Sequence, residues 1–414
     1  MPKSMRTDSP RNHRDVRELG ELLSRVFRMD ILGLESFARR FAENPAVRPS
    51  FQRILRHRGR IVAHVGIHEM TLRVGRARLR MGGIAGVACD PQFRRRGWAA
   101  ACMREALDLL QRERFPLSLL FGIEQYYLRF GYVGCLPTYT LRLGVKQLRA
   151  LKSRLHPAPY APRDLQDLVR LYNAAAKETP GSAIRDPARM AYPLRPWGLR
   201  ERFQKDIEKQ VLVFRARAGR GPVRAYLVWD HGKLLEAALE PGDEPACVAV
   251  LAWLREQRLQ ALEKEVVLCN LCPAHPLWRY AQRFTHSAER ELRWSAGGMG
   301  RLIDVDALLE ALRPELEARL NSAGLESECH LHLIVDGKEH SLILGRAHQL
   351  SLSISTHRLI LYSRVECSSQ ALLQMALGTL PFDRIPEVKI EGERSLLRAA
   401  FPESSPHLYR LDHF

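Results

Sequence analysis

The stretch RRRGWAA, Arg94 to Ala100, follows the apolar run GGIAGVAC, Gly82 to Cys89, and precedes a helical pattern. The helix is predicted because apolar side chains recur on one face: Ala99, Cys102, Met103, Ala106, Leu107, Leu109 and Leu110. This order of strand, basic turn and helix directs the unpaired N–H groups of the helix start beyond the strand end. Gly97 permits close backbone approach, and arginines hold phosphate oxygens in pairs. We therefore predict an anion site that suits a diphosphate.

The two commonest phosphate-binding loops do not occur in this sequence. It contains neither GxxxxGK[ST] nor a GxGxxG after a strand. Nucleoside triphosphates and dinucleotides are therefore disfavoured as ligands of the basic turn.

Length and composition indicate a globular protein of two or three domains, since the chain has 414 residues, 46% of them apolar and 27% charged. No apolar run approaches the roughly 20 residues of a membrane span, and the basic N-terminus lacks the apolar region of a secretory signal. We expect a cytoplasmic protein with reduced cysteines. Cys269 and Cys272 have His275 nearby but no second ligand pair at zinc spacing, so no metal site is expected.

Hydrophobic periodicity divides the chain into three units, which we name the first (residues 1–150), second (151–300) and third unit (301–414). A helix is expected over 20–41 and a linker over 153–162, which holds three prolines. The second unit repeats the helix and strand order of the first. The third has a helix, a hairpin around Asp336-Gly337, the strands LSLSIS and RLILYS, and a second helix. The predicted fold class is α/β or α+β.

The basic turn resembles a known cofactor loop. Its form [Gln/Arg]-x-x-Gly-x-[Gly/Ala], matched by Arg94, Gly97 and Ala99, and the later YYLRFGYV (126–133) resemble the GCN5-related N-acetyltransferases (GNAT). The resemblance implies acetyl-CoA as cofactor. The residues implied to bind it are Val87, Ala88, Cys89, Arg94, Arg95, Arg96, Gly97, Trp98, Ala99, Ala100, Gly122 and Ile123. The strand end at Val87–Cys89 is implied to splay from its neighbour, to pair with the pantetheine arm and to polarise the thioester carbonyl through a backbone N–H.

The whole chain resembles the enhanced-intracellular-survival (Eis) family more narrowly. The resemblance rests on FRRRG, YLRFGY, a second unit of similar order and a C-terminal Asp-x-Phe. It implies a catalytic GNAT domain, a degenerate GNAT-like domain and a sterol carrier protein 2-like domain. It also implies acetylation of primary amines, a symmetric homo-oligomer, often a hexamer, and a terminal carboxylate in the active site.

The second unit departs from the acetyltransferase pattern at its own loop. Between LLEAALE and the helix ACVAVLAWL stands PGDEP, with two acids and no arginine. Such a loop repels a diphosphate. We expect one cofactor site per chain, with the second unit as a wall of the active site and an assembly surface.

Two residues are candidates for proton transfer. Tyr127 occupies the family's acid position, three residues before Phe-Gly-Tyr, and an ordinary tyrosine pKa near 10 suits donation to a thiolate. The alternative is an aromatic ring buried beside the cofactor. The Phe414 carboxylate is the candidate base, and the alternative is a terminus that only packs. His64, His68 and Glu69 fit polar residues of a strand face better than they fit a base.

Charge distribution bears on the partners. Residues 1–150 hold 28 Lys and Arg against 13 Asp and Glu, and the remainder holds 36 against 33. A nucleic-acid-binding module is one alternative, but the arginines are dispersed and no aromatic stacking motif is present. A lipid carrier is another, but the third unit's hairpin shows ordinary alternation. Because positive charge repels polycations, we expect a small-molecule amine that is otherwise neutral or acidic, with no membrane partner.

Overall fold

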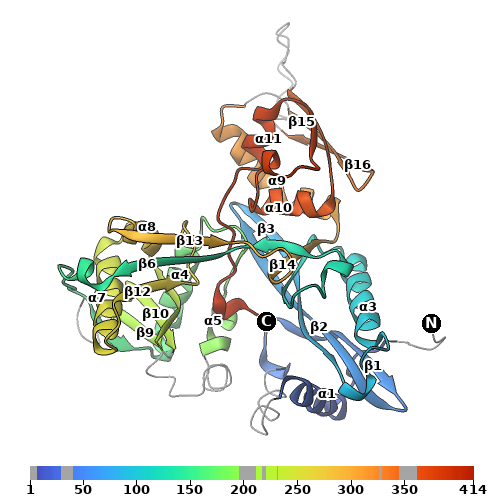
Figure 1. Ribbon diagram of the computed structural model, residues 1–414, viewed down its shortest axis with the longest axis horizontal. Helices are drawn as coiled ribbons and strands as arrows, with labels where there is room; N and C mark the ends of the chain where they lie inside the picture. Colours follow the sequence, from blue (N-terminus) through green and yellow to red (C-terminus); the bar gives the residue numbers. More distant parts are fainter. Residues whose placement is uncertain are drawn as a thin grey trace, which may run out of the picture.

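The structure is a computed structural model that describes residues 7–28, 41–194, 211–216, 221–230, 232–325, 329–344 and 361–414. Three bodies meet near the C-terminus of the chain, which lies at the centre of the molecule (Figure 1). In the described part of the chain, no helix is long and apolar enough to cross a membrane.

A seven-stranded sheet forms the centre of the first unit. Its order is β1-β2-β3-β4-β14-β5, with β8 paired to β2. The bounds are β1 Val47–His57, β2 Arg60–Val74, β3 Ala77–Cys89, β4 Leu117–Gly122, β5 Val133–Leu136, β8 Ser182–Ala183 and β14 Gly297–Leu302. Two of these strands come from outside residues 1–150. The boundary predicted at 300/301 falls inside β14, which pairs with β4 and β5.

Helices cover both faces of this sheet. Because side chains of one strand alternate between faces, β2 contacts helices on both sides. On one face α3 (Trp98–Arg112) packs its buried side chains against Val65 and Ile67 of β2. On the other face Leu72 packs against helices of the third unit. The helix α1 (His13–Phe27) begins at Asn12, whose side chain accepts a hydrogen bond from the Asp15 N–H. The first and third units therefore share one core.

The described residues of the second unit form two smaller sheets and four helices. One sheet has the order β11-β10-β9-β7 and the other β12-β6-β13. The strands are β6 Thr138–Gly144, β7 His156–Pro159, β9 Val211–Arg215, β10 Ala225–Asp230, β11 Lys233–Leu239, β12 Glu265–Cys269 and β13 His286–Glu291. The helices are α4 Leu165–Ala175, α5 Pro187–Leu194, α7 Glu244–Gln260 and α8 Pro276–Ala281. Because β6 pairs with β12 and β13, a strand from residues 1–150 belongs to this body.

The third unit packs helices against a sheet of order β16-β15-β17-β18. Its elements are α9 Val305–Ser322, β15 Cys329–Val335, β16 Lys338–Leu344, β17 Leu361–Cys367, α10 Ser369–Leu377, β18 Lys389–Gly392 and α11 Arg394–Ala400. The predicted hairpin at Asp336-Gly337 is confirmed, and both residues have the positive φ that such a turn requires. Glu315 of α9 accepts a hydrogen bond from the Arg76 N–H in the β2–β3 turn, at 2.7 Å.

Several sequence expectations differ from the structure. The predicted linker at 153–162 is wrong, because His156–Pro159 forms β7 at the edge of a sheet, where prolines are tolerated. The first helix begins at His13 rather than at Gly20. The rest of its predicted length, residues 29–40, lies outside the described residues, as do the strand LSLSIS and the start of RLILYS.

Candidate functional site

The strands β3 and β4 separate at the centre of the first sheet. Their parallel ladder contains three pairs, from Met81–Leu117 to Gly83–Leu119. Beyond Gly83, β3 continues to Cys89 without a partner on the β4 side. This geometry is a fork, open toward the ends of both strands. The predicted splay of Val87, Ala88 and Cys89 from the neighbouring strand is present, whereas their contact with a pantetheine arm stays a prediction.

A bulge shapes β3 inside the fork. The β2–β3 register shifts between His64 and Gly66, and Gly86 has φ +57°. The ring nitrogens of His64 lie 2.7 Å from the Gly86 carbonyl oxygen and 3.1 Å from Gln52 Oε1. Burial lowers the pKa of His64 to about 4, so the ring is neutral near pH 7 and donates to one of these oxygens. His64 therefore supports the bulge, which agrees with its interpretation as a polar residue of the strand face.

The basic turn lies beyond the end of β3, at the start of α3. Gly97 is the N-cap residue, with φ +82°, and it contributes no side chain to the helix start. Arg95 also has positive φ, at +61°. Trp98, Ala99 and Ala100 form the first turn. Gly97 therefore gives the N–H groups of this turn no capping side chain, as the anion-site prediction requires.

The three arginines of the turn differ from several others in the first unit, which have acidic partners. Arg94, Arg95 and Arg96 are exposed, and none forms an ion pair within the described residues. Other arginines of this unit are neutralised: Arg25 and Arg60 pair with Asp90, Arg48 and Arg80 with Glu69, and Arg56 with Asp15 and Glu18. Cations that lack acidic partners at a helix N-terminus are available to an external anion.

Tyr127 lies five residues after the end of β4, directly before the short turn η2 (Leu128–Phe130). Its ring packs where Gly122 has no side chain: a Cβ added to Gly122 would lie 2.9 Å from Tyr127 Cδ2. Burial raises the pKa of Tyr127 to about 12. The hydroxyl makes no hydrogen bond within the described residues and is not among the fully enclosed polar atoms. It is thus a protonated donor without a protein partner. Ile123, the next residue after Gly122, is 67% exposed.

Phe414 reaches the same strand from the third unit. Its ring covers Gly83, the last residue of the β3–β4 ladder: a Cβ there would lie 2.6 Å from Phe414 Cζ. The ring centroids of Phe414 and Phe121 are 5.8 Å apart. His413 stacks on Phe121 at 3.6 Å. Because Phe121 and Gly122 are successive residues of β4, Phe414 and Tyr127 approach the strand from opposite faces.

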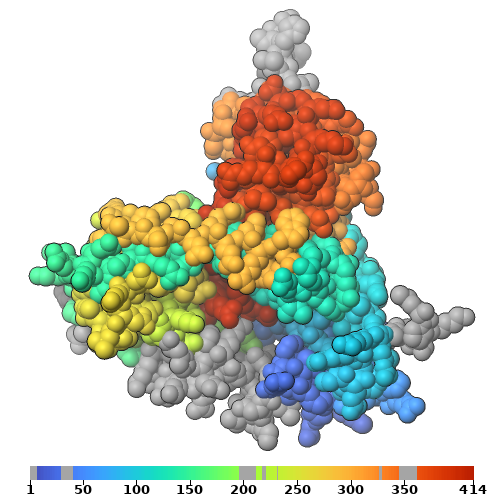
Figure 2. All heavy atoms as spheres, viewed as in Figure 1, coloured from blue at the N-terminus to red at the C-terminus, as the bar shows by residue number. Residues whose placement is uncertain are grey.

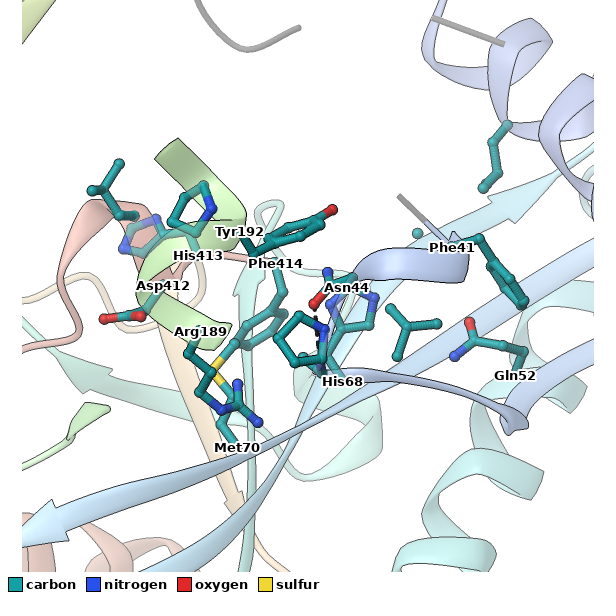
Figure 3. Close-up of a pocket in the computed structure, with 18 of the residues that line it drawn as sticks. Phe41, Asn44, Gln52, His68, Met70, Arg189, Tyr192, Asp412, His413 and Phe414 are labelled. Carbon is teal, nitrogen blue, oxygen red and sulfur yellow. Dashed lines mark hydrogen bonds between the residues drawn. The ribbon is translucent and has the colours of Figure 1, made fainter. Parts of the chain in front are cut away.

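A cavity of about 240 Å³ adjoins the C-terminal residue. Figure 3 shows residues of β2, of α5 and of the C-terminal segment facing it. Its walls include Met70, Tyr192 and Phe41, and its polar groups include His68, Arg189 and the end of the chain. The rings of His68 and Phe414 are 6.0 Å apart. Glu69 does not serve this cavity as a free acid, because it pairs with Arg48 and Arg80.

Cysteine chemistry is not prominent at the site. Burial raises the pKa of Cys89, so its thiol is protonated near pH 7. In the second unit, Cys272 contacts Thr179, and His275 caps α8 through its Nδ1. No group of three or more potential metal ligands occurs within the described ranges.

The structure brings together most of the residues singled out in the sequence and adds others. Val87–Cys89, the turn at Arg94–Ala100 and the β4 end at Gly122 flank one fork, with Tyr127 on one face and Phe414 on the other. The sequence analysis missed Arg189 and Tyr192, which belong to α5 of the second unit. No local pattern marks them, because their role depends on the contact between two units.

Part of the chain matches a known family model, and the whole chain is similar to solved structures. Residues 10–134, less than a third of the chain, match the family model described as an acetyltransferase (GNAT) domain. The chain is similar to the crystal structure of a GCN5-related N-acetyltransferase from Kribbella flavida, with 17% identity, a TM-score of 0.69 and coverage of 99% and 98% of the two chains. It is also similar to one from Anabaena variabilis (16% identity, TM-score 0.68, coverage 99% and 100%) and to Eis1 from Mycobacterium abscessus (14%, 0.64, 99% and 100%).

These similarities show the fold. No curated protein matches the chain. The α/β fold class is confirmed, and the first unit carries a GNAT domain. The likeness of the third unit to sterol carrier protein 2 and the predicted domain boundaries stay predictions.

Proposed function

We propose that the protein is an acetyl-CoA-dependent N-acetyltransferase with one active site per chain, at the fork of the first unit. The observation that carries this proposal is an α3 N-terminus that begins at Gly97 with no capping side chain, next to an open strand pair. Three exposed arginines that form no ion pair among the described residues precede it. The acetyltransferase (GNAT) match over residues 10–134 points in the same direction. Acetyl-CoA supplies the acetyl group as a reactive thioester.

The chain's own residues divide the work of binding. Arg94, Arg95, Arg96 and the N–H groups of Trp98 to Ala100 hold the diphosphate of the cofactor. Nothing lies within 4 Å of a Cβ added to Gly97, so the turn leaves room for a ligand at this point. Val87–Cys89 pairs with β2 on one side, and its backbone on the side of β4 offers hydrogen bonds to an extended arm and to the carbonyl oxygen of the reacting group.

Two groups handle the protons. Tyr127 holds a proton on its hydroxyl, and the raised pKa of about 12 keeps it there across the neutral range. Donation to the leaving sulfur is harder than an ordinary tyrosine pKa implies. Desolvation also raises the pKa of a thiol held in the same place. The difference in pKa between the Tyr127 hydroxyl and the leaving thiol is therefore smaller than the raised tyrosine pKa alone implies. The carboxylate of Phe414 accepts the proton of the amine, through water or from the zwitterionic adduct, because an ordinary α-carboxyl pKa of about 3.5 is low for direct removal.

The cavity supports an acceptor that is neutral or acidic apart from its amine. Arg189 faces the cavity and makes no ion pair within the described residues; its Nη2 donates to the Glu69 backbone oxygen. Met70, Tyr192 and Phe41 supply apolar surface. A cation in the wall disfavours a polycation and suits a carboxylate or an uncharged body. A cytoplasmic location and a homo-oligomer remain part of this proposal.

Nucleic-acid binding is not favoured as a second function. Five arginines of the first unit are already used in ion pairs with Asp15, Glu18, Glu69 and Asp90. The others are dispersed over helix, strand and loop rather than gathered in one patch. A lipid-carrier function has no specific observation in its support.

The test measures thiol release from acetyl-CoA with a panel of amines: monoamines with apolar bodies, amino acids and aminoglycosides. We expect turnover with members of the first two classes. Efficient acetylation of aminoglycosides would contradict the acceptor assignment. A chain that binds no coenzyme A contradicts the proposed function.

In the same assay, we expect Tyr127→Phe to lower kcat by about 100-fold or more, because a proton donor is lost while the ring remains. Coenzyme A affinity should stay unchanged. An unchanged kcat would remove Tyr127 from the reaction.

A further inference from the structure

The last residues of the chain run from the second unit to the fork of the first. The His407 N–H donates to the Pro180 carbonyl oxygen at 2.9 Å, and Tyr409 and Leu411 pack in the core of the second unit. Two residues after the short turn η7 (Arg410–Asp412), Phe414 lies on Gly83 of β3. The dark red segment is visible between the other bodies in Figure 2. The second unit therefore guides the C-terminus to the site.

Asp412 is the residue of this path that a buried ion network holds, and His413 after it stacks on Phe121. Arg185 donates to both of its carboxylate oxygens, from Nε to Oδ1 at 2.9 Å and from Nη2 to Oδ2 at 2.8 Å. The Tyr172 hydroxyl donates to Oδ2 at 2.8 Å. A bidentate arginine–carboxylate pair fixes orientation as well as distance. The Asp412 carboxylate is thus held in one position beside the cavity that it helps to line.

Arg185 is in turn fixed from its other side. Its Nη1 and Nη2 donate to the two oxygens of Glu236 on β11, at 2.8 and 2.7 Å. The guanidinium carbon lies 3.6 Å from the centre of the Tyr172 ring. The side chains of Arg185 and Glu236 have no exposed surface. Tyr226 donates to Glu236 at 2.6 Å, so each oxygen of that carboxylate has a partner.

The segment that carries Arg185 is bound to the first unit through its backbone. Just before it, β8 pairs with β2, and the Ile184 N–H donates to the Thr71 oxygen at 2.8 Å. Just after it, α5 supplies Arg189 to the cavity. The anchor of Asp412 and the wall of the cavity therefore belong to one continuous segment, tied to the same strand β2 that lines the site.

We propose that Arg185, held by Glu236, is a positioning residue that places the terminal carboxylate of Phe414 at the active site by fixing Asp412. Two residues span at most about 7 Å, so the position of Asp412 limits where the carboxylate can lie. A buried ion network adds little stability compared with apolar residues of similar size, so stability alone does not account for it. The second unit thereby delivers the base of the reaction. The catalytic consequence rests on the proposed function, whereas the anchoring of the C-terminus does not.

The test replaces the network by neutral residues of similar size, in the variant Arg185→Met, Glu236→Gln, Asp412→Asn. Removing all three charges leaves no unpaired buried ion. The matched control is Arg215→Met, Asp164→Asn, which neutralises another buried ion pair of the second unit that does not touch the C-terminal segment. A second variant, Arg185→Lys, keeps the charge but loses the bidentate geometry. The same measurements are made on Arg185→Lys if the triple variant does not fold.

Two readouts are measured on the full chain. The first is the rate at which carboxypeptidase Y releases Phe414, followed by mass spectrometry. The second is kcat and KM for acetyl-CoA with the best amine of the panel. An otherwise unchanged chain with one added C-terminal glycine, whose carboxylate is moved by about 3.5 Å, is the reference for a displaced base.

We expect the triple variant to release Phe414 at least about tenfold faster than wild type and control. Its kcat should fall about 100-fold, as misplacement by an ångström can cause, with KM for acetyl-CoA within about twofold. The glycine-extended chain should show a similar loss of kcat. If the triple variant releases Phe414 at the wild-type rate, the network does not anchor the C-terminus. If it releases Phe414 faster but keeps the wild-type kcat, the anchor has no role in the reaction. If wild type acetylates no amine, the proposed function fails, and the release rates still decide the anchor.

Discussion

The first and second units each place a helix after a strand, but the two helix starts are used differently. At α3, Gly97 offers no side chain, and the neighbouring arginines 94–96 lack acidic partners among the described residues. At α7, the Asp243 side chain accepts a hydrogen bond from the Ala246 N–H at 3.0 Å, and Arg224 pairs with the same carboxylate. A helix N-terminus attracts an anion in both units. In the second unit the Asp243 carboxylate fills this role, whereas in the first unit the helix N-terminus remains for a ligand.

The strand pairs show the same contrast. In the first unit, β3 and β4 pair and then separate, so that β3 beyond Gly83 faces an open fork. In the second, β11 and β12 belong to different sheets, and side chains close the gap between them. Asn270 donates to the Leu234 oxygen at 3.1 Å, and His275 Nε2 lies 3.0 Å from the Ala237 oxygen. Because these β11 carbonyls already have partners, they are not available to a pantetheine arm.

The most direct test of this contrast places an acidic N-cap residue, like that of α7, at the start of α3. In Gly97→Asp, a carboxylate occupies the α3 N-terminus, and we expect the Kd for coenzyme A to rise about 100-fold, because charge-assisted hydrogen bonds to the diphosphate are lost. No atom lies within 4 Å of the new Cβ, and aspartate tolerates positive φ better than most residues. Isothermal titration calorimetry measures the change, with circular dichroism as the check on folding.

The control for that variant is Asp243→Ala in the second unit. It should destabilise the protein by about 1 kcal/mol, the ordinary cost of a lost N-cap, and leave coenzyme A binding unchanged. Weaker binding in Asp243→Ala, or unchanged binding in Gly97→Asp, contradicts the comparison.

A third comparison concerns two buried histidines, His64 at the fork of the first unit and His275 beside β11 in the second. Burial lowers the pKa of His64 to about 4 and that of His275 to about 3. Below pH 6.5 the unfolded chain binds protons that the folded protein excludes, so stability is complete above about pH 6.5 and falls toward pH 4. Each histidine contributes about 3 kcal/mol to this loss at pH 4.5.

The measurement is the melting temperature between pH 7 and 4.5. His64→Asn and His275→Asn should each flatten the pH dependence. His64→Asn alone should also weaken coenzyme A binding, because the His64 ring supports the bulge in β3. Equal pH slopes for wild type and both variants would show that neither ring is held neutral.

Local sequence patterns predicted much of the first fork. An apolar strand, the basic turn and an amphipathic α3 are encoded by residues close together in the chain, and so is the acidic PGDEP loop at α7. By contrast, β14 enters a sheet whose other long strands lie more than 160 residues earlier, and no periodicity specifies that partner. The proline-rich edge strand β7 had the composition of a linker.

The candidate site was predicted where its residues share a motif and missed where units meet. Tyr127 and Phe414 were predicted from family resemblance rather than from a physical pattern, and their catalytic roles stay predictions. Arg185 and Asp412 are 227 residues apart, and a single buried arginine has no local signature. Burial, which raises the pKa of Tyr127 to about 12, likewise becomes visible only in the folded chain.

The central claim is that the chain has one cofactor site, at the fork of the first unit. Calorimetric titration of wild type with coenzyme A tests it most directly, because stoichiometry does not depend on the acceptor. We predict one site per chain, whose Kd rises about 100-fold in Gly97→Asp and is unchanged in Asp243→Ala. Two sites per chain, or one site that survives in Gly97→Asp and disappears in Asp243→Ala, would contradict the account.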